Sequence, residues 1–236
     1  MKILALDSSA ITAAVALCED ETLLASFVEN NGNTHSQTLL PMIEQMLKIN
    51  NTDIDEIDLF ALSAGPGSFT GVRIGAATIK GLAFGRNKPC VAVSTIAALA
   101  ENLRFFNGII CPVMNARRSQ LYNAVFLSNG NNIKRLCADR LITEDDLYLE
   151  LKNYNDKIYF CGDGYSLIKA ACSSIKTENT PEYLIPPSGY SVAVCAIEAY
   201  KKGDFTTDKK LSPVYLRASQ AERELAEKNK LNKIEV

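Results

Sequence analysis

Histidine is nearly absent from this chain, and its scarcity excludes most metal sites and many catalytic sites. The 236 residues include one histidine, His35, and no tryptophan. One imidazole cannot build a paired-histidine metal site or a zinc finger. A Ser-His-Asp site would depend on His35, and the chain has no GxSxG elbow to carry the serine. We therefore expect His35 to cap a helix or form a hydrogen bond, and we expect no metal.

The chain also lacks an excess of charge and any long apolar run. Lysine and arginine number 25 against 27 acidic residues, for a net charge of -2. This balance argues against a large nucleic-acid footprint held by charge alone, although a small basic patch or an RNA contact made with a partner's help remains compatible. Asp7 interrupts the first apolar run too early for a signal peptide, and no run approaches about 18 residues. We expect a cytoplasmic protein without a membrane span.

Paired cysteine motifs are missing as well. The seven cysteines are odd in number, contain no CxxC, and occur in apolar stretches such as Gly-Ile-Ile-Cys111-Pro-Val. Buried, reduced thiols fit this pattern better than a disulfide framework.

Apolar periodicity predicts two successive α/β series. The first contains strands 2–8, 11–18, 22–29, 57–64 and 90–94 and helices 36–49, 70–85 and 95–104. The second contains strands 108–114, 120–127, 133–141 and 157–161 and helices 143–153, 164–173 and 191–202. Two lobes fit this order better than one doubly wound sheet, and the opening hairpin favours an actin-like fold. We expect a first lobe over 1–104 to which 208–218 returns, a second lobe over 105–207, and a disordered tail over 219–236.

Asp7-Ser8-Ser9 follows the first strand and is a candidate nucleotide pocket. A polar turn there could place N–H groups and hydroxyls against a phosphate, with the carboxylate holding Mg²⁺ through water. The alternative is an ordinary hairpin turn in which these side chains bond their own backbone. If the pocket exists, we expect it to be vestigial, with weak ATP or ADP binding.

The segment from Gly65 to Gly75, Gly-Pro-Gly-Ser-Phe-Thr-Gly-Val-Arg-Ile-Gly, joins a strand to a helix. It is neither a Walker A loop nor a dinucleotide fingerprint. Thr70 is a candidate N-cap, and Arg73 would then oppose the helix dipole and require a partner such as a carboxylate or a bound anion. The small residues Gly71, Gly75 and Thr78 share one face, which could pack on the chain's own sheet or against another chain.

Helix 36–49 carries an apolar stripe wider than one contact requires, which favours one internal contact and one with another chain. Pro41 predicts that this helix begins late, near Thr38, or is kinked. We assign the partner interface to Leu39, Leu40, Met42, Ile43, Met46, Leu47, Gly71, Arg73, Ile74, Gly75 and Thr78. A charge at Ile43 or Gly75 should then disrupt association and leave the fold largely intact.

These motifs together resemble the bacterial TsaB family of tRNA threonylcarbamoyladenosine biosynthesis proteins. The resemblance rests on Ile-Leu-Ala-Leu-Asp7-Ser-Ser, His35-Ser-Gln-Thr-Leu-Leu-Pro41, the Gly65–Gly75 segment, Pro112-Val-Met-Asn-Ala-Arg117-Arg-Ser-Gln-Leu-Tyr122 and Leu211-Ser-Pro-Val-Tyr-Leu-Arg217. It covers nearly the whole chain except the tail. One departure is Asn115, where the family usually has Asp, so a contact made by that carboxylate would be weaker here.

The resemblance implies an actin-like, noncatalytic subunit. It would pair with the catalytic relative TsaD, act with the ATPase TsaE, and form a homodimer when alone. TsaC would make the threonylcarbamoyl donor, and tRNA would be met indirectly through the complex. TsaD binds a metal through HxxxH, whereas Thr95 and Leu99 stand at those positions here, and neither can replace an imidazole.

Two other functions remain open from the residues alone. An active actin-like ATPase or small-molecule kinase would need a second phosphate loop, and only Gly162-Asp163-Gly164 is available. A self-associating scaffold without an enzyme partner is the third possibility.

Overall fold

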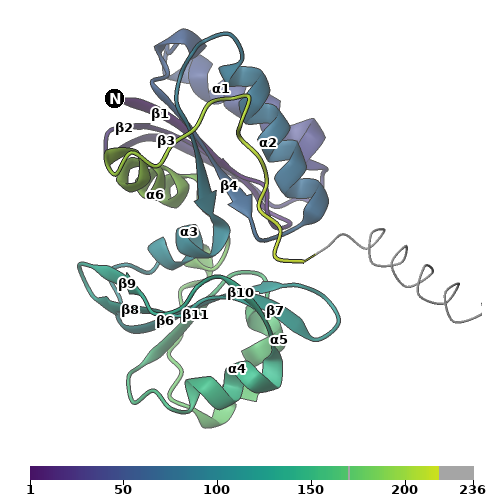
Figure 1. The fold of residues 1–236 in the computed structure, drawn as a ribbon, viewed down its shortest axis with the longest axis vertical. Helices are drawn as coiled ribbons and strands as arrows, with labels where there is room; N and C mark the ends of the chain where they lie inside the picture. The colour runs from purple at the N-terminus through teal and green to yellow at the C-terminus, as the bar shows by residue number, and fades with distance from the viewer. Residues whose placement is uncertain (170, 218–236) are drawn as a thin grey trace, which may run out of the picture.

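The computed structural model describes residues 1–169 and 171–217, which form two α/β lobes (Figure 1). The sheet of the first lobe contains β1 (Lys2–Asp7), β2 (Ala13–Glu19), β3 (Thr22–Glu29), β4 (Leu59–Gly65) and β5 (Cys90–Ser94). Its strand order is β3-β2-β1-β4-β5, with β1, β4 and β5 parallel and β2 and β3 antiparallel. The predicted opening hairpin and the strand at 90–94 are confirmed.

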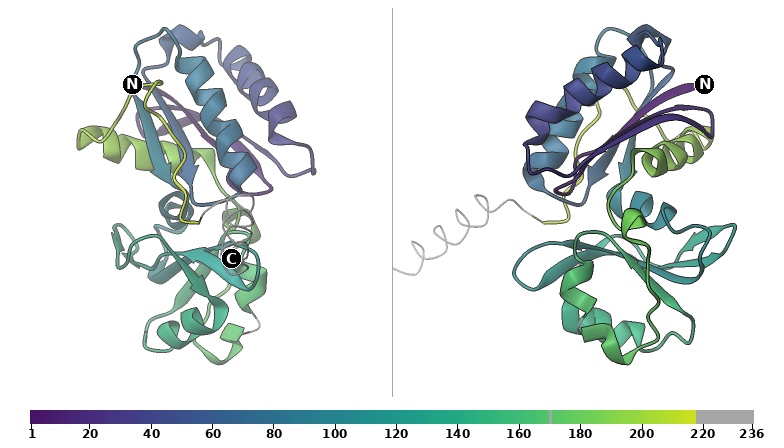
Figure 2. Two further views of the ribbon diagram at one scale, coloured as in Figure 1. Left: turned by 45° about the vertical axis from the view of Figure 1, so that its right-hand side comes forward. Right: turned by 180° about the vertical axis from the view of Figure 1, so that it is seen from behind.

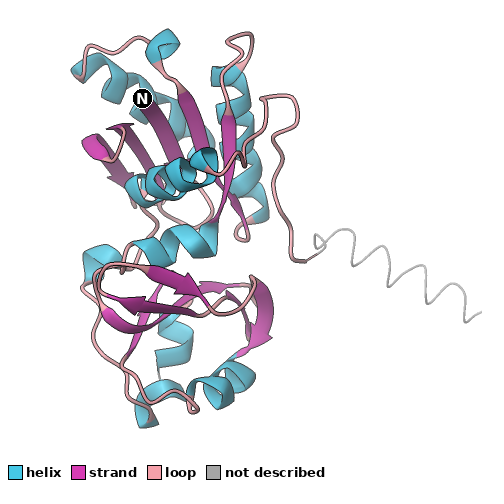
Figure 3. Ribbon diagram, turned by 60° about the vertical axis from the view of Figure 1, so that its left-hand side comes forward, coloured by secondary structure: helices cyan, strands magenta, loops and turns pink. Residues whose placement is uncertain are grey.

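Helices cover both faces of this sheet (Figures 2 and 3). Alternate strand residues explain this: Leu4 and Leu6 pack towards α1 (His35–Ile49) and α2 (Phe69–Ala83), whereas Ile3 and Ala5 pack towards α6 (Gly189–Lys201). The sequence placed the last helix in the second lobe, and this was wrong. Its apolar residues Val192, Ala193 and Ala196 are buried against the first sheet.

Two predicted helix starts also require correction. α1 begins at His35 in spite of Pro41, because the carbonyl of Gln37 that loses its donor lies on the exposed face, where water can satisfy it. For α2 the N-cap is Ser68, whose hydroxyl accepts a hydrogen bond from the Gly71 amide at 3.2 Å, rather than Thr70.

The second lobe is built around the long strand β6 (Asn107–Asn115). Its sheet has the order β10-β7-β6-β8-β9, and β11 (Ile158–Cys161) pairs parallel with β6. The predicted strands 120–127 and 133–141 are each divided, into β7 (Gln120–Asn123), β8 (Phe126–Asn129), β9 (Ile133–Arg135) and β10 (Arg140–Thr143). One face of the sheet packs on α4 (Glu144–Leu151) and α5 (Tyr165–Lys169).

α3 (Thr95–Glu101) lies between the two sheets. Ile96, Leu99 and Ala100 belong to the apolar cluster of the second lobe, whereas Ala98 packs with the first. The helix ends three residues earlier than predicted, in a turn in which the Leu103 amide donates to the Ala100 carbonyl at 3.0 Å. This single short helix therefore connects the cores of both lobes.

Residues 206–217, here named the strap, run back over the first lobe (Figure 1). Thr206 and Cys90 exchange two backbone hydrogen bonds, Leu211 is buried in the core, and the Val214 amide donates to the Ala64 carbonyl at 2.7 Å. Gly65 has φ +124, and a Cβ there would lie 2.3 Å from the Val214 carbonyl oxygen. The close approach of the strap therefore requires glycine at position 65. The predicted tail, 219–236, lies outside the described residues.

All seven cysteines are free thiols, and five of them are buried. Burial raises the pKa of the Cys18 and Cys172 thiols to about 11. None of the helices in the described part of the chain has the length and apolar character needed to cross a membrane.

Candidate functional site

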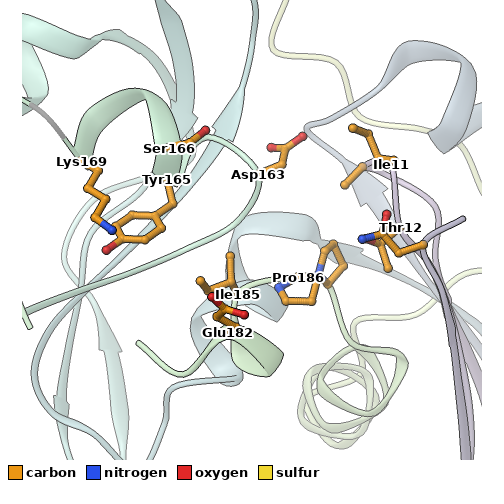
Figure 4. A pocket seen from close by; sticks show the side chains of 12 residues that line it. Ile11, Thr12, Asp163, Tyr165, Ser166, Lys169, Glu182, Ile185 and Pro186 are labelled. Carbon is orange, nitrogen blue, oxygen red and sulfur yellow. The ribbon is translucent and has the colours of Figure 1, made fainter. Parts of the chain in front are cut away.

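The two lobes enclose a cleft of about 510 Å³ (Figure 4). Its first-lobe wall comes from the β1–β2 turn at Ala10–Thr12, and its second-lobe wall from Asp163, Tyr165 and Lys169. The segment around Glu182 and Pro186 closes the base. The sequence pointed to the turn and to Asp163 but missed Tyr165, Lys169 and Glu182, because α5 and the proline-rich segment carry no motif that marks them as cleft residues.

Asp7, Ser8 and Ser9 are fully buried beside this cleft, at the end of β1. Asp7 Oδ1 accepts hydrogen bonds from the Ser9 amide at 2.8 Å and from the Ser9 hydroxyl at 2.7 Å. Oδ1 is thus bonded within its own turn, whereas Asp7 Oδ2 is buried without a hydrogen-bond partner among the described residues. Burial raises the pKa of the Asp7 carboxyl above its ordinary value, and the bonds from Ser9 oppose that rise.

Ser8 is covered by α2. Its hydroxyl donates to the Gly71 carbonyl at 2.9 Å, and Cβ atoms built at Gly71 and Gly75 would lie 2.0 Å from the Ser8 carbonyl oxygen and 2.4 Å from its hydroxyl oxygen. The two helix glycines therefore serve close packing on β1 within this chain. Of the three candidate pocket residues, none presents its side chain to the cleft volume.

The structure also places His35, Thr95 and Leu99, which the sequence analysis considered in relation to metal binding. His35 Nε2 donates to the Ala10 carbonyl at 2.8 Å, which confirms the expected hydrogen-bonding role. Thr95 is fully buried, and Leu99 belongs to the interlobe core. Among residues 1–169 and 171–217, no three His, Cys, Asp or Glu side chains gather as metal ligands.

The turn Gly162-Asp163-Gly164 is explained by packing. A Cβ at Gly162 would lie 2.2 Å from the Val113 carbonyl oxygen, and the Gly164 amide donates to that carbonyl at 3.0 Å. Asp163 Oδ1 accepts the Asn115 amide at 2.9 Å. The turn therefore holds β11 against the end of β6.

The outward face of α1 and α2 is a second candidate site. Of the predicted interface residues, five are covered by the chain itself: Leu39, Ile43, Met46, Gly71 and Gly75. Met42, Leu47, Ile74 and Thr78 are half-buried, and Leu40 and Arg73 are exposed. The sequence missed three exposed residues on α2 and just after it: Ala77, Gly81 and Phe84. A charge at Ile43 or Gly75 would therefore damage the fold, contrary to the expectation from sequence.

The protein groups that contact Arg73 are aromatic side chains, and no carboxylate of the described residues pairs with it. Its guanidinium carbon lies 3.9 Å from the centroid of the Phe69 ring, and its Nε donates to the Tyr215 hydroxyl at 2.9 Å. The two rings lie 4.5 Å apart. Phe69 and Tyr215 thus both hold Arg73, and we name these three residues the aromatic clamp. Tyr215 comes from the strap.

The β6–β7 loop presents two more arginines. Arg117, Arg118 and Ser119 all have positive φ, between 54° and 62°. Left-handed backbone costs about 1–2 kcal/mol per non-glycine residue, so the surrounding contacts must hold this loop. Asn115 Oδ1 accepts the Arg117 amide at 2.7 Å, so this side chain bonds the main chain of the loop.

Comparison with known proteins agrees with this architecture. The family model for TsaD, tRNA N6-adenosine threonylcarbamoyltransferase, matches residues 23–225. The chain is 30% identical over 233 residues to the tRNA threonylcarbamoyladenosine biosynthesis protein TsaB of Bacillus subtilis, covering 98% of this chain and 100% of that one. It is 28% identical to the Escherichia coli protein of the same name, covering 95% and 98%.

A solved structure described as an uncharacterized protein with similarity to peptidase YEAZ, from Pseudomonas aeruginosa, superposes with a TM-score of 0.73 at 24% identity, covering 92% of this chain and 99% of that one. This likeness concerns the fold, and the predicted two-lobed α/β class is confirmed. The matching family model and the full-length relatives establish that the chain belongs to the TsaB family of tRNA threonylcarbamoyladenosine biosynthesis proteins.

Proposed function

We propose that this chain is a noncatalytic subunit of tRNA threonylcarbamoyladenosine biosynthesis in the cytoplasm. It pairs with TsaD, and TsaE joins them to support transfer of the threonylcarbamoyl group to the N6 of the adenosine beside the anticodon. Without TsaD, the same surface joins two copies of the chain. The observation that carries this proposal is the uncovered apolar and small-residue face of α1 and α2.

That face has the character of a helix–helix interface. Leu40 is 53% exposed and Phe84 is 71% exposed. On α2, Ala77 and Gly81 are exposed small residues, and a Cβ at Gly81 would meet nothing within 4 Å. Small residues beside large apolar ones allow two helices of a partner to approach closely and bury both kinds of side chain.

The interlobe cleft supports the noncatalytic part of the proposal. Asp7 is bonded to Ser9, and the Gly162–Gly164 turn is packed on β6. We expect the purified chain to release no phosphate from ATP above the rate of an Asp7→Ala variant. A turnover that Asp7→Ala abolishes would favour the actin-like ATPase or kinase instead.

The pairing is tested by light scattering of the purified chain with and without TsaD. The double variant Leu40→Glu/Ala77→Glu should keep its circular dichroism spectrum and weaken TsaD binding at least about 100-fold, because burying unpaired carboxylates costs several kcal/mol. Leu149→Glu is the matched control, since Leu149 is an exposed leucine of α4. Wild-type affinity in the folded double variant would place the interface elsewhere.

A further inference from the structure

The arginines of the described residues divide into two sets. Four of them pair with carboxylates within 4 Å: Arg86 with Asp55, Arg104 with Glu101 and Glu198, Arg135 with Asp139, and Arg140 with Glu150. The other four, Arg73, Arg117, Arg118 and Arg217, form no ion pair with any residue that the structure describes.

The strap brings the unpaired set together. Its Tyr215 binds Arg73 of α2, and two residues later Arg217 Nη1 donates to the Ala116 carbonyl at 3.0 Å, beside Arg117 and Arg118. Figure 1 shows the strap descending beside α2 to the level of the second lobe. Four arginines from three distant parts of the sequence therefore lie on segments that meet along the strap, and Arg117 and Arg118 directly follow the residue that Arg217 binds. We name these four arginines the basic rim.

We propose that the basic rim binds the phosphate groups of an RNA strand. The identity of that RNA as tRNA rests on the proposed function, and direct contact goes beyond the indirect contact implied by the family resemblance. Planar guanidinium groups bind phosphate through two parallel hydrogen bonds, and arginines are the usual residues for this task.

The surroundings of the rim favour RNA over an acidic protein. Tyr215 is 40% exposed and lies against Phe69, so an aromatic surface on which an unpaired base could stack stands beside Arg73. A rim of four arginines is also small enough to agree with the net charge of -2.

The rim is held in place before any ligand arrives. The aromatic clamp restricts Arg73, and the Asn115 side chain and the Arg217 guanidinium bond the main chain of the left-handed loop. Such ordering lowers the conformational entropy lost on binding.

The test is fluorescence anisotropy of a labelled, unmodified tRNA transcript titrated at several salt concentrations. The full chain is used alone and with TsaD. Arg117→Gln/Arg118→Gln should lose at least tenfold in affinity, and the slope of log K against log salt should shrink by about 1.4, since each phosphate contact contributes about 0.7 on a single strand. Lys152→Gln/Lys202→Gln removes two exposed charges elsewhere and should leave affinity and slope unchanged.

Equal affinity and slope in the two double variants would overturn the proposal that the basic rim binds RNA. Equally tight binding of polyglutamate in place of RNA would overturn it as well. Light scattering of the arginine variant with TsaD separates this result from the proposed function. Pairing that persists while RNA binding falls supports both. If wild-type chain fails to pair with TsaD, the pairing is wrong, and the titration of the chain alone still decides the rim.

Discussion

The two faces of α2 look alike in sequence and differ completely in the fold. Gly71 and Gly75 face inward, where added Cβ atoms would meet Ser8 at 2.0 and 2.4 Å. Ala77 and Gly81 face outward, and Gly81 has open space around it. The inner face lets the helix pack closely on β1, whereas the outer face is free for another chain. Small residues at helical spacing therefore indicate close packing without saying against what.

The largest expected difference in stability is between substitutions on the inner and the outer face of α1. Ile43 is 2% exposed and Leu40 is 53% exposed. Ile43→Glu should lower the free energy of unfolding by about 3–5 kcal/mol, because it buries an unpaired carboxylate in the core. Leu40→Glu should change it by less than about 0.5 kcal/mol. Urea titration followed by circular dichroism checks both; equal stabilities would mean that the inner face is not core.

The next largest difference in stability is expected between substitutions of an inward and an outward glycine of α2. Gly71→Ala should destabilise the chain by about 3 kcal/mol, at the upper end of overpacking, because the clash is with the backbone of Ser8. Gly81→Ala should stabilise it by about 0.5–1 kcal/mol through helix propensity. Thermal unfolding of the two alanine variants measures this difference in sign. Two shifts in the same direction would contradict it.

The burial of Asp7 at the end of β1 is tested by the pH dependence of stability. Burial raises its pKa in the folded state, so the folded chain binds the proton more tightly than the unfolded chain. This carboxyl therefore lowers stability as pH rises above its unfolded pKa of about 3.9. Asp7→Asn should melt at a higher temperature than wild type at pH 7, and the gain should shrink towards pH 4. An equal gain at both pH values would show that ionisation is not its source.

A substitution in the aromatic clamp should give the smallest change in stability. Tyr215→Phe removes the acceptor for Arg73 Nε and keeps the ring stacked on Phe69. Because this hydrogen bond is exposed to water, the loss of stability should be about 0.5 kcal/mol or less. Tyr215→Ala also removes the ring and should lose more. Melting temperatures of both variants compare the hydrogen bond with the stacking.

Much of the fold follows from local patterns. Short continuous apolar runs identify β1, β2 and β4, and the glycine segment marks the start of α2. Strands 120–127 and 133–141 could not be divided correctly, because their breaks depend on contacts between distant strands. One such contact is the Leu136 amide donating to the Val125 carbonyl at 2.8 Å. Likewise, α6 follows the second lobe in sequence and joins the first only through burial against its sheet.

The candidate sites were predictable to different degrees. The sequence marked Asp7, Gly71 and Arg73 as candidate site residues, whereas Arg117 and Arg118 entered only as part of a motif that carries the family resemblance. It could not assign inner and outer faces to α1 and α2, because an apolar stripe wide enough for two contacts does not show which half meets the sheet. It also could not show that Tyr215, which lies 142 residues away in sequence, accepts a hydrogen bond from Arg73.

By itself, the sequence determined the α/β class, the family and the lack of paired histidine ligands, since composition, periodicity and motif order carry that information. The tertiary structure alone decided that Gly71 and Gly75 pack on Ser8, that Leu40 and Ala77 stay uncovered, and that the strap gathers Arg73, Arg117, Arg118 and Arg217. The physical reason is that burial and proximity are properties of segments distant in sequence, and they are fixed only when the sheets and helices pack together.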